Sequence, residues 1–366
     1  MHVVGERVDL ADYTTLRLGG PAARFTLAET ADEVAAQVRA ADLAGQPLLV
    51  LGGGSNLVVA DAGFDGSVVK VATRGLDIAA AGPDRVAVTV AAGQDWDALV
   101  AWTVGENLAG LECLSGIPGS VGATPVQNVG AYGQEVATSI ISVGVLDRAT
   151  GQCAVLTGPR CGFGYRTSVF KSAAWPQSGP AGPTGRYVLL DVTFGLARSD
   201  LSEPVGYAEL AARLGVEMGA RAPLARVREA VLDLRRGKGM VLDPADPDSV
   251  SAGSFFTNPV LDDGQLADLA AAAERRLPGV AVPRYPAGPG LVKVPAAWLI
   301  ERAGFGKGYP GSGPVRISAK HTLALTNRGG ATTADLLALA REVVAGVADA
   351  FGVVLTNEPV LVGVAL

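Results

Sequence analysis

Residues 116–133 read GIPGSVGATPVQNVGAYG, a stretch punctuated by five glycines. Glycine has no Cβ, so the backbone N–H groups of such a segment can approach a ligand closely. Between the glycines stand hydroxyl and amide side chains, which can hydrogen-bond to a pyrophosphate or to the edge of a flavin ring. A purely structural loop is the alternative, but long glycine-rich loops inside compact domains are usually functional. The stretch therefore predicts one wall of a dinucleotide cradle.

A second glycine-rich loop, LGGGSN at residues 51–56, follows the apolar run at 48–51. A strand that ends in consecutive glycines can turn its N–H groups toward a phosphate, although a plain turn explains this loop equally well on its own. The dinucleotide fingerprint GxGxxG is excluded, because Leu57 stands where the third glycine would be. Taken with residues 116–133, the loop predicts cofactor contacts from Gly52, Gly53, Gly54, Ser55, Asn56, Gly116, Gly119, Ser120, Gly122, Ala123, Thr124, Gln127, Asn128, Gly130, Ala131 and Tyr132.

Composition places the chain among globular proteins and argues against some classes of partner and site. With 366 residues, of which 49% are hydrophobic and 18% charged, two or three domains are expected. The net charge is −6 and no basic stripe emerges, which argues against nucleic acid as a partner. Two histidines and three cysteines without a CxxC pair argue against a metal site and against a disulfide framework.

The ends of the chain and its apolar runs bear on localisation. The N-terminal residues MHVVGERVDL lack the basic and then apolar pattern of a secretory signal. No apolar run reaches membrane-spanning length. We therefore expect a cytoplasmic protein that does not bind membranes.

Hydrophobic periodicity predicts a mixture of helices and strands. A capping box at Thr30–Glu33 precedes the first helix, and Pro223 is expected in the first turn of a helix that carries apolar residues from Leu224 to Leu234 on one face. Other helices are expected over 95–106, 262–277, 295–303 and 333–351, and strands over 48–51, 68–71, 86–90, 143–147, 186–194, 353–355 and 360–364. Because helices and strands do not alternate strictly, an α+β fold is favoured over a doubly wound one.

Three side chains carry candidate chemistry. Arg166, in GYRTSVFK at 164–171, can present a planar fork to a carboxylate, although a surface charge is the better interpretation of an isolated arginine. Ser254, in SAGSFFTNP at 251–259, lies between glycine and two phenylalanines and could donate a proton. Its local sequence alone favours the alternative, a buried strand with an incidental serine. Glu358, in TNEP at 356–359, could bind or polarise a substrate, or be a loop charge.

In their order along the chain, these segments resemble the UDP-N-acetylenolpyruvoylglucosamine reductase (MurB) family. Eight segments spread over nearly the whole chain carry the resemblance, which makes it specific. They are TTLRLGG at 14–20, LGGGSNLV at 51–58, the 116–133 loop, GYRTSVFK at 164–171, GSFFTNP at 253–259, WLIE with GKG at 298–308, KH at 320–321 and NEP at 357–359.

The resemblance implies a two-domain flavoenzyme. Residues 1–200 would form an FAD-binding domain of the vanillyl-alcohol-oxidase/PCMH type, with α+β subdomains of about 1–72 and 73–200. Residues 201–366 would form an α+β substrate-binding domain whose last strands pack back near the flavin. NADPH would reduce FAD, which would pass hydride to the enolpyruvyl carbon of the UDP-sugar and so give UDP-N-acetylmuramate.

The resemblance also implies roles for single residues. Ser254 matches the proton donor of the family, and Arg166 and Glu358 match its catalytic arginine and glutamate. Substrate contacts are implied at Tyr165, Tyr207, Lys238, Asn258 and His321, with Tyr207 marking the longer class whose loop closes over the UDP group. A monomer is expected. Two stretches, 171–185 and 239–249, look like insertions relative to the family.

Two other interpretations remain open on the sequence. The loops at 51–58 and 116–133 would serve any FAD-dependent oxidoreductase of the same flavin fold, whatever its substrate. A non-catalytic flavin-binding paralogue is the second alternative. GSFFTNP and the late Asn-Glu-Pro argue against the former, and the intact Arg166, Ser254 and Glu358 argue against the latter.

Overall fold

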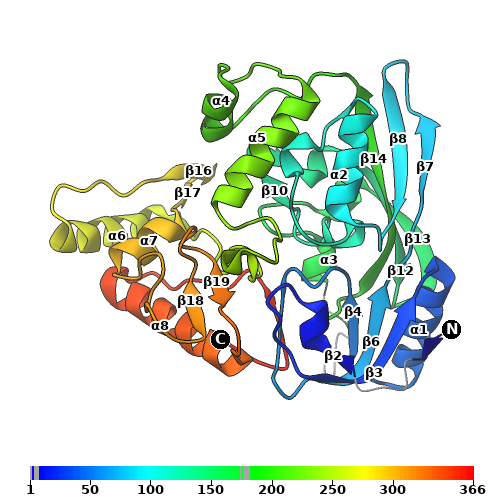
Figure 1. Cartoon of the computed structure of the whole chain (residues 1–366), viewed down its shortest axis with the longest axis horizontal. Coiled ribbons are helices and arrows are strands. Elements are labelled where there is room, and N and C mark those ends of the chain that lie inside the picture. Colours follow the sequence, from blue (N-terminus) through cyan, green and yellow to red (C-terminus); the bar gives the residue numbers. More distant parts are fainter. Residues whose placement is uncertain (1, 4–7, 174, 176–181) are drawn as a thin grey trace. The chain divides into compact units, whose positions relative to one another are not determined.

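The computed structural model describes residues 2, 3, 8–173, 175 and 182–366. The chain forms two compact units, and neither is a single continuous stretch. The first comprises Met1–Asp9, Pro21–Gly54 and Phe64–Val241, and the second comprises Leu10–Gly20, Ser55–Gly63 and Leu242–Leu366. Figure 1 colours the chain along its sequence, so the blue segments of the second unit can be told from its yellow to red ones.

A sheet with a parallel centre carries the first glycine-rich loop at its edge. Its central strands run in the order β3, β6, β4, and Leu51 at the end of β4 lies opposite Lys70 of β6. Helix α1 (Ala31–Leu43) buries Val34 and Val38 in the same core as Leu48 of the sheet. The strands are β1 (His2–Val3), β2 (Val8–Asp9), β3 (Pro21–Ala28), β4 (Leu48–Leu51) and β6 (Phe64–Val71).

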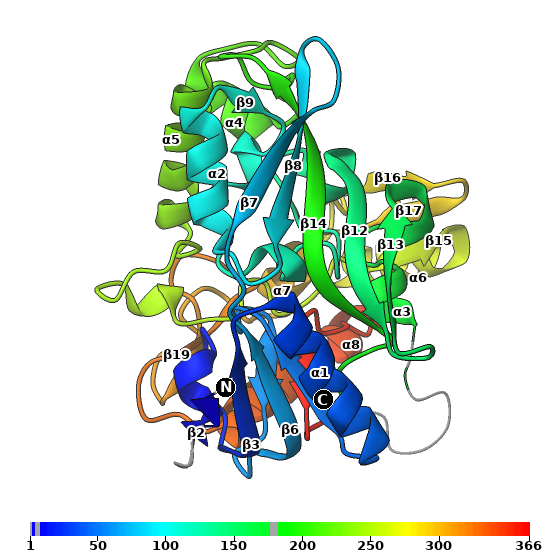
Figure 2. The same ribbon diagram turned by 90° about the vertical axis from the view of Figure 1, so that its right-hand side faces the viewer.

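The second sheet of the first unit is antiparallel, and its strands follow one another as β7, β8, β14, β12, β13 from left to right in Figure 2. Alternate valines of β8 are buried, as the two-residue period of a strand requires. Helix α2 (Trp96–Gly105) packs on this sheet, with the ring of Trp96 5.9 Å from that of Phe194. The strands are β7 (Leu76–Ala80), β8 (Arg85–Ala91), β9 (Leu108–Ala109), β12 (Ile140–Asp147), β13 (Gln152–Thr157) and β14 (Tyr187–Arg198).

Helices α4 (Ala208–Leu214) and α5 (Leu224–Gly237) also belong to the first unit. Leu210 and Val227 share a core with Cys113, and Arg228 of α5 forms an ion pair of 2.6 Å with Asp97 of α2. The compact units therefore divide near residue 241, whereas the sequence led us to expect a division at 201. Short elements of this unit include α3 (Val169–Ser172), β10 (Gly130–Ala131), β11 (Gln134–Glu135), η2 (Glu112–Leu114), η3 (Val121–Ala123), η4 (Val136–Thr138) and η5 (Gly158–Cys161).

The second unit is built around helix α8 (Thr333–Phe351). Its buried face includes Leu336, Val343 and Val347, which share a core with Phe255 and Phe256. Around it lie α6 (Asp263–Arg276), α7 (Ala296–Arg302), β5 (Leu57–Val59), β15 (Val260–Asp262), β16 (Tyr285–Gly288), β17 (Leu291–Lys293), β18 (Val315–Ile317), β19 (Leu325–Asn327), β20 (Val360–Val362), η1 (Leu10–Tyr13) and η6 (Pro247–Ser249).

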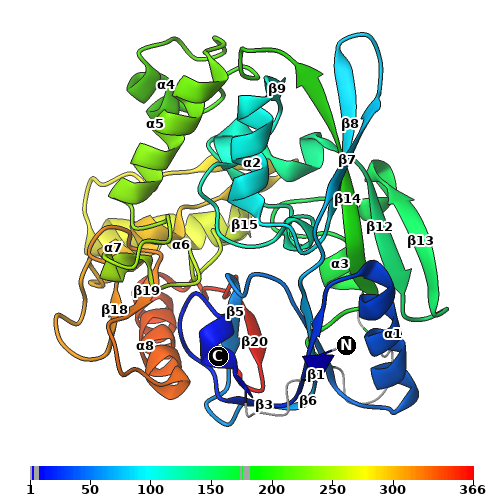
Figure 3. The same cartoon turned by 45° about the vertical axis from the view of Figure 1, so that its right-hand side comes forward.

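Two early segments join the second unit through specific hydrogen bonds. β5 pairs in parallel with β20 near the end of the chain, and Figure 3 shows the two strands side by side. Thr333 Oγ1 donates to the Val59 carbonyl at 2.6 Å, and Asn327 Nδ2 donates to the Leu16 carbonyl at 3.0 Å. Residues 10–20 and 55–63 are therefore anchored by residues some 300 positions later in the chain.

The α+β fold and the predicted helices are confirmed, whereas two local predictions change. Residues 353–355 are not a strand: Val354 is exposed, and the Thr356 carbonyl accepts from Thr257 N instead of joining a ladder. The capping box is half formed, because Thr30 accepts from Glu33 N while the Glu33 carboxylate accepts from Glu29 N. β5 was not predicted, since a three-residue strand shows no periodicity.

Two further observations complete the comparison with the sequence. Within the described ranges, no helix combines the length and apolar character needed to cross a membrane. Residues 174 and 176–181 of the expected surface loop at 171–185 lie outside the described residues, and α3 occupies the start of that stretch.

Candidate functional site

The predicted site residues divide between the two units. The second unit holds Ser55, Asn56, Ser254, Asn258, His321 and Glu358, and the first unit holds all the others. The glycines of both loops, Arg166 and the expected tyrosines and lysine therefore belong to one unit, whereas the expected proton donor and glutamate belong to the other.

The two glycine-rich loops touch each other within the first unit. A Cβ placed on Gly53 would lie 2.5 Å from Gly119 Cα, and one on Gly52 would lie 2.5 Å from Ser120 Oγ. Close-packed atoms do not approach so closely, so a side chain at Gly53 would force one backbone to move. Gly53 is itself exposed, whereas Gly54 is buried with φ +63°. The arrangement leaves backbone rather than side chains at the surface of the cradle, which fits a dinucleotide.

The loop at 119–124 is fixed by its own backbone bonds. Val121 N donates to the Gln94 carbonyl, and Gly122 N donates to the Ala92 carbonyl at 2.8 Å. A Cβ on Gly122 would lie 2.5 Å from Ala92 Cβ. The Thr124 hydroxyl is buried and donates to the Val121 carbonyl. The predicted contact from Thr124 is therefore better explained as support for the loop.

Asn128 likewise supports the loop. It has φ +47° and is 1% exposed, and its Nδ2 donates to Glu135 Oε2 at 2.8 Å and to the Gly164 carbonyl. Its Oδ1 accepts from Ala137 N. Both amide hydrogens are used within the protein, so the side chain has no donor left for the edge of a flavin.

Arg166 lies against the second glycine loop. Its guanidinium donates to the Gly130 carbonyl at 3.2 Å and to the Asn128 carbonyl at 3.4 Å, and it packs on the ring of Tyr165, with 5.6 Å from Cζ to the ring centre. Its φ of +53° is uncommon for a residue with a side chain. Sequence analysis predicted a carboxylate-binding arginine, and the structure attaches this arginine to the loop expected to hold the flavin.

Two tyrosines and a lysine meet at the C-terminal end of this loop. The rings of Tyr132 and Tyr207 pack edge to face with their centres 5.6 Å apart, and Lys238 Nζ lies 5.6 Å from the ring centre of Tyr132. Glu209 of α4 forms an ion pair with Lys238 at 2.6 Å. Burial raises the pKa of Tyr132 to about 12, so its hydroxyl is a neutral donor. The structure thus brings three predicted residues together and adds Glu209 to them.

Gly116 starts the loop in a conformation that requires glycine. Its φ is +72°, and a Cβ there would lie 2.7 Å from Leu232 Cδ2. Gly116 N donates to Asp97 Oδ1 at 2.6 Å. Burial works to raise the pKa of Asp97, but the hydrogen bonds from Arg228 and Gly116 outweigh it and lower the pKa. Gly116 is therefore held by an ionised aspartate.

In the second unit, Phe255 connects the predicted catalytic residues. Phe255 N donates to the Leu323 carbonyl at 2.7 Å, and the Phe255 carbonyl accepts from Glu358 N at 2.8 Å. Glu358 is joined in turn to Asn56, whose Nδ2 donates to the Glu358 carbonyl at 3.4 Å. Ser254 therefore lies one residue from a backbone junction that also positions Glu358.

Ser254 has the environment that its sequence predicted. It is partly buried between Gly253, with φ +72°, and two phenylalanines that are 1% exposed. Its hydroxyl forms no hydrogen bond with any other residue that the structure describes. A hydroxyl in such a position remains available to a ligand.

The other two predicted residues of this unit have structural bonds of their own. Asn258 Oδ1 accepts from Ala296 N, the first N–H of α7, at 2.9 Å. The ring nitrogen Nδ1 of His321 accepts from Leu323 N at 3.2 Å, and the backbone N–H of His321 donates to Ser318 Oγ. Among the described residues, the amide nitrogen of Asn258 has no hydrogen-bond acceptor and is left to meet a substrate.

The residue that sequence analysis missed at the cradle is Lys70. Its Nζ donates to the Gly52 carbonyl at 2.5 Å. The sequence contains a sign of this role, because Lys70 is a single charge within the apolar strand VVKV at 68–71. A lone lysine at a strand end does not by itself predict a site residue.

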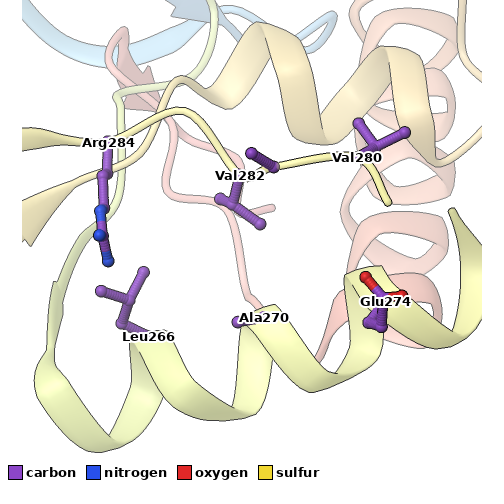
Figure 4. A pocket seen from close by; sticks show the side chains of 7 residues that line it. Leu266, Ala270, Glu274, Val280, Val282 and Arg284 are labelled. Atoms are coloured by element: carbon purple, nitrogen blue, oxygen red, sulfur yellow. The ribbon is translucent and has the colours of Figure 1, made fainter. Parts of the chain in front are cut away.

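A pocket of about 310 Å³ in the second unit lies apart from these residues in sequence. Figure 4 shows it between α6 and the segment that follows, with Glu274 and Arg284 toward its two ends. Glu274 already accepts from Gly279 N. The lining between the two charged groups is aliphatic and includes none of the predicted site residues.

Comparison with known proteins matches two parts of the chain to known domains. An FAD-binding domain model matches residues 22–157. The model of the C-terminal domain of UDP-N-acetylenolpyruvoylglucosamine reductase matches residues 244–362. Two relatives of that name, from Thermobifida fusca and Saccharopolyspora erythraea, are 60% and 58% identical to the chain. Each match covers 98% of this chain, and 98% and 95% of the relatives.

The chain belongs to the UDP-N-acetylenolpyruvoylglucosamine reductase family. A solved structure of the enzyme of that name from Thermus caldophilus agrees, with 26% identity, a TM-score of 0.63 and 99% of both chains covered. Family membership makes the chain an enzyme, an FAD-dependent oxidoreductase of peptidoglycan precursor synthesis. The expected family and FAD-binding domain are confirmed. The roles expected of single residues are not tested by these matches.

Proposed function

We propose that the chain reduces UDP-N-acetylglucosamine enolpyruvate to UDP-N-acetylmuramate, with NADPH as the hydride source and Ser254 as the proton donor. FAD held on the two glycine-rich loops would supply hydride transfer from NADPH to the methylene carbon of the enolpyruvyl group. The protein itself supplies binding, charge stabilisation and the proton.

The contact between the two glycine-rich loops is the observation that carries the proposal. Gly53 comes so close to Gly119 that the first loop tolerates no side chain at this point, and Gly119 itself has φ +131°, a conformation that side chains rarely adopt. Backbone surfaces of this kind are what a diphosphate-linked dinucleotide requires. We therefore place the flavin on these loops, with Arg166 beside it through the Gly130 carbonyl.

Hydride addition at the methylene carbon leaves negative charge on the adjacent carbon and on the carboxylate conjugated with it. A guanidinium fork suits that carboxylate, and this is the role proposed for Arg166. The Ser254 Oγ–H bond breaks as a C–H bond forms at the charged carbon, and the serine then recovers a proton from solvent. Glu358, which shares the Phe255 junction with Ser254, would assist this transfer.

The UDP-sugar is the proposed small-molecule substrate. Lys238 would meet its diphosphate, Tyr165, Asn258 and His321 would contact the sugar or its pyruvyl group, and Tyr207 would belong to a loop that closes over it. Asn258 retains its amide nitrogen for this purpose, since only its oxygen is bonded to Ala296. We also propose that the enzyme works as a monomer in the cytoplasm.

An anaerobic titration tests the function in two stages. NADPH should bleach the visible absorbance of the bound flavin, and the enolpyruvyl sugar should then restore it with one equivalent of UDP-N-acetylmuramate formed. Bleaching that the enolpyruvyl sugar does not reverse would reject the proposed substrate. A purified protein without flavin, which also fails to bind added FAD, would reject the cofactor site.

A further inference from the structure

Lys70 is placed under the glycine loop by the register of the parallel sheet. It lies on β6 opposite Leu51, and Gly52 is the next residue along the chain from Leu51. Its Nζ donates to the Gly52 carbonyl at 2.5 Å, which is short for such a bond and typical of a charged donor. The lysine therefore fixes the direction in which the Gly52 carbonyl points.

The direction of that carbonyl determines the direction of the next N–H. The peptide between Gly52 and Gly53 is trans, as are all described peptide bonds except Tyr309–Pro310. In a planar trans peptide the C=O and N–H point in opposite directions. With the Gly52 oxygen directed toward Lys70, the Gly53 N–H is directed away from β6.

That N–H is available to a ligand. Gly53 is exposed, and its N–H donates to no acceptor among the residues that the structure describes. An unpaired backbone N–H at the tip of a glycine loop is a natural donor to a phosphate oxygen. The contact of Gly53 with Gly119 places this donor where the two loops meet.

The charge of Lys70 also lacks a partner. No carboxylate of a described residue forms an ion pair with it, and the neighbouring charge that acts on it, that of Arg74, has the same sign. Burial, reinforced by Arg74, lowers the pKa of Lys70 below its ordinary value. A cation that is partly buried without a counterion is stabilised when an anion binds close by.

We propose that Lys70 is a positioning residue for the diphosphate of FAD, which holds the Gly52–Gly53 peptide so that the Gly53 N–H faces a phosphate oxygen. This inference rests on the proposed location of the flavin on the glycine loops. It adds a residue from the sheet beneath the loop to a site otherwise made of loop backbone.

The test compares three variants of the protein, each freed of flavin and titrated with FAD while flavin fluorescence is followed. In Lys70→Met the dissociation constant for FAD should rise roughly 10- to 100-fold, the range of a lost charge-assisted bond. In Lys70→Arg, which keeps a cationic donor, it should stay within about threefold of wild type. Arg74→Met is the matched control, because it removes a neighbouring charge without touching Gly52, and it should also stay within about threefold.

Melting temperatures separate ligand positioning from a purely structural role. Lys70→Met should reduce the rise in melting temperature that FAD produces and leave the flavin-free protein near the wild-type value. Equal losses in the flavin-free and FAD-bound forms, or an unchanged affinity for FAD, would overturn the proposal. If Lys70→Met does not fold, Lys70→Gln is measured against the same criteria. Failure of the wild-type protein to bind FAD would instead reject the proposed function.

Discussion

In the first unit, the loops that we assign to the flavin are shaped by backbone contacts between glycines, whereas in the second unit Ser254 and Glu358 are placed by a backbone junction at Phe255. A glycine contact leaves a direct trace in the sequence, because no other residue fits it. A junction of backbone hydrogen bonds leaves none, because any residue can make them. The first site can therefore be derived from its residues, and the second rests on its similarity to a family.

Replacing Ser254 tests the second unit most directly. In Ser254→Ala, NADPH should reduce the flavin at the wild-type rate, whereas reoxidation by the enolpyruvyl sugar should slow by about 10²- to 10⁴-fold, the range of general acid catalysis. Stopped-flow absorbance of the flavin follows both steps. Thr257→Val is the control, because it removes a nearby hydroxyl that bonds only to the Thr356 carbonyl. Reoxidation of Ser254→Ala at the wild-type rate would remove Ser254 from the mechanism.

Replacing Gly53 tests the first unit. In Gly53→Ala the new Cβ would meet Gly119 Cα at 2.5 Å, so the loops must separate, at a cost of about 1–3 kcal/mol in the free energy of unfolding. The ratio of flavin to protein absorbance should fall as the cradle opens. Gly105→Ala, at the exposed end of α2, has no atom within 4 Å of the added methyl and should keep its flavin. Equal flavin content in both variants would show that the loop contact does not shape the site.

The second unit also depends on a buried ion pair. Asp248 is 5% exposed and accepts from Arg328 Nη2 at 2.5 Å and from Ala319 N at 2.8 Å. Burial works to raise the pKa of Asp248, but hydrogen bonds from Ser318 and Ala319 and the charge of Arg328 outweigh it and lower the pKa. This carboxylate therefore stabilises the fold above its unfolded pKa of about 4, and the stabilisation is lost as the pH falls through the lower folded value.

We accordingly expect Asp248→Asn to lose about 1.5–3 kcal/mol of the free energy of unfolding at pH 7. The difference from wild type should shrink as the pH falls from about 4 through the lower pKa of the folded carboxylate, because the unfolded chain takes up the proton first and the folded wild-type protein only at the lower pH. Urea denaturation at pH 7 and below about pH 4 measures this difference in the free energy of unfolding. Asp268→Asn, exposed on α6, should differ from wild type by no more than about 0.5 kcal/mol. A difference that is independent of pH would exclude the charge of Asp248 as its cause.

The elements that could be predicted from the sequence are those with a local pattern of apolar residues. Long amphipathic helices such as α8 have a periodic pattern and buried strands such as β4 a continuous apolar run, and both were found where expected. β5 and its pairing with β20 were not, because three residues show no period and the partner lies some 300 positions away. Residues 353–355 were predicted as a strand because Val-Val-Leu is a short apolar run, but the structure gives them no ladder and leaves Val354 exposed.

In the candidate site, the glycines could be predicted from the sequence, whereas several side-chain contacts could not. The glycines of both loops could be derived from physical argument, since their conformations and contacts exclude other residues. The sequence predicted Asn128 as a flavin ligand, but both of its amide hydrogens are donated to Glu135 and Gly164 outside the loop, which only the three-dimensional structure reveals. Lys70 and Glu209 act on predicted residues from separate elements, so no local motif contains them.

The smallest expected effect concerns that glutamate. Glu209 pairs with Lys238, the residue proposed to meet the substrate diphosphate, and both side chains are partly exposed. Glu209→Gln should free the lysine and lower the KM for the enolpyruvyl sugar by up to about fivefold, the limit set by the strength of a surface ion pair. The decrease should be larger at low ionic strength, where exposed charges are less screened. Steady-state kinetics at two salt concentrations measures both effects.

Replacing the exposed Glu229 of α5 by glutamine supplies the control, because it removes the same charge from the same unit without releasing Lys238. If KM rises in Glu209→Gln, the glutamate must hold Lys238 in position for the substrate instead of competing with it. In that case the ion pair belongs to the binding site, and the side chains of α4 would have to be added to a site that otherwise depends on loop backbone. If KM changes equally in both variants, the effect arises from net charge alone, and Lys238 loses its proposed role.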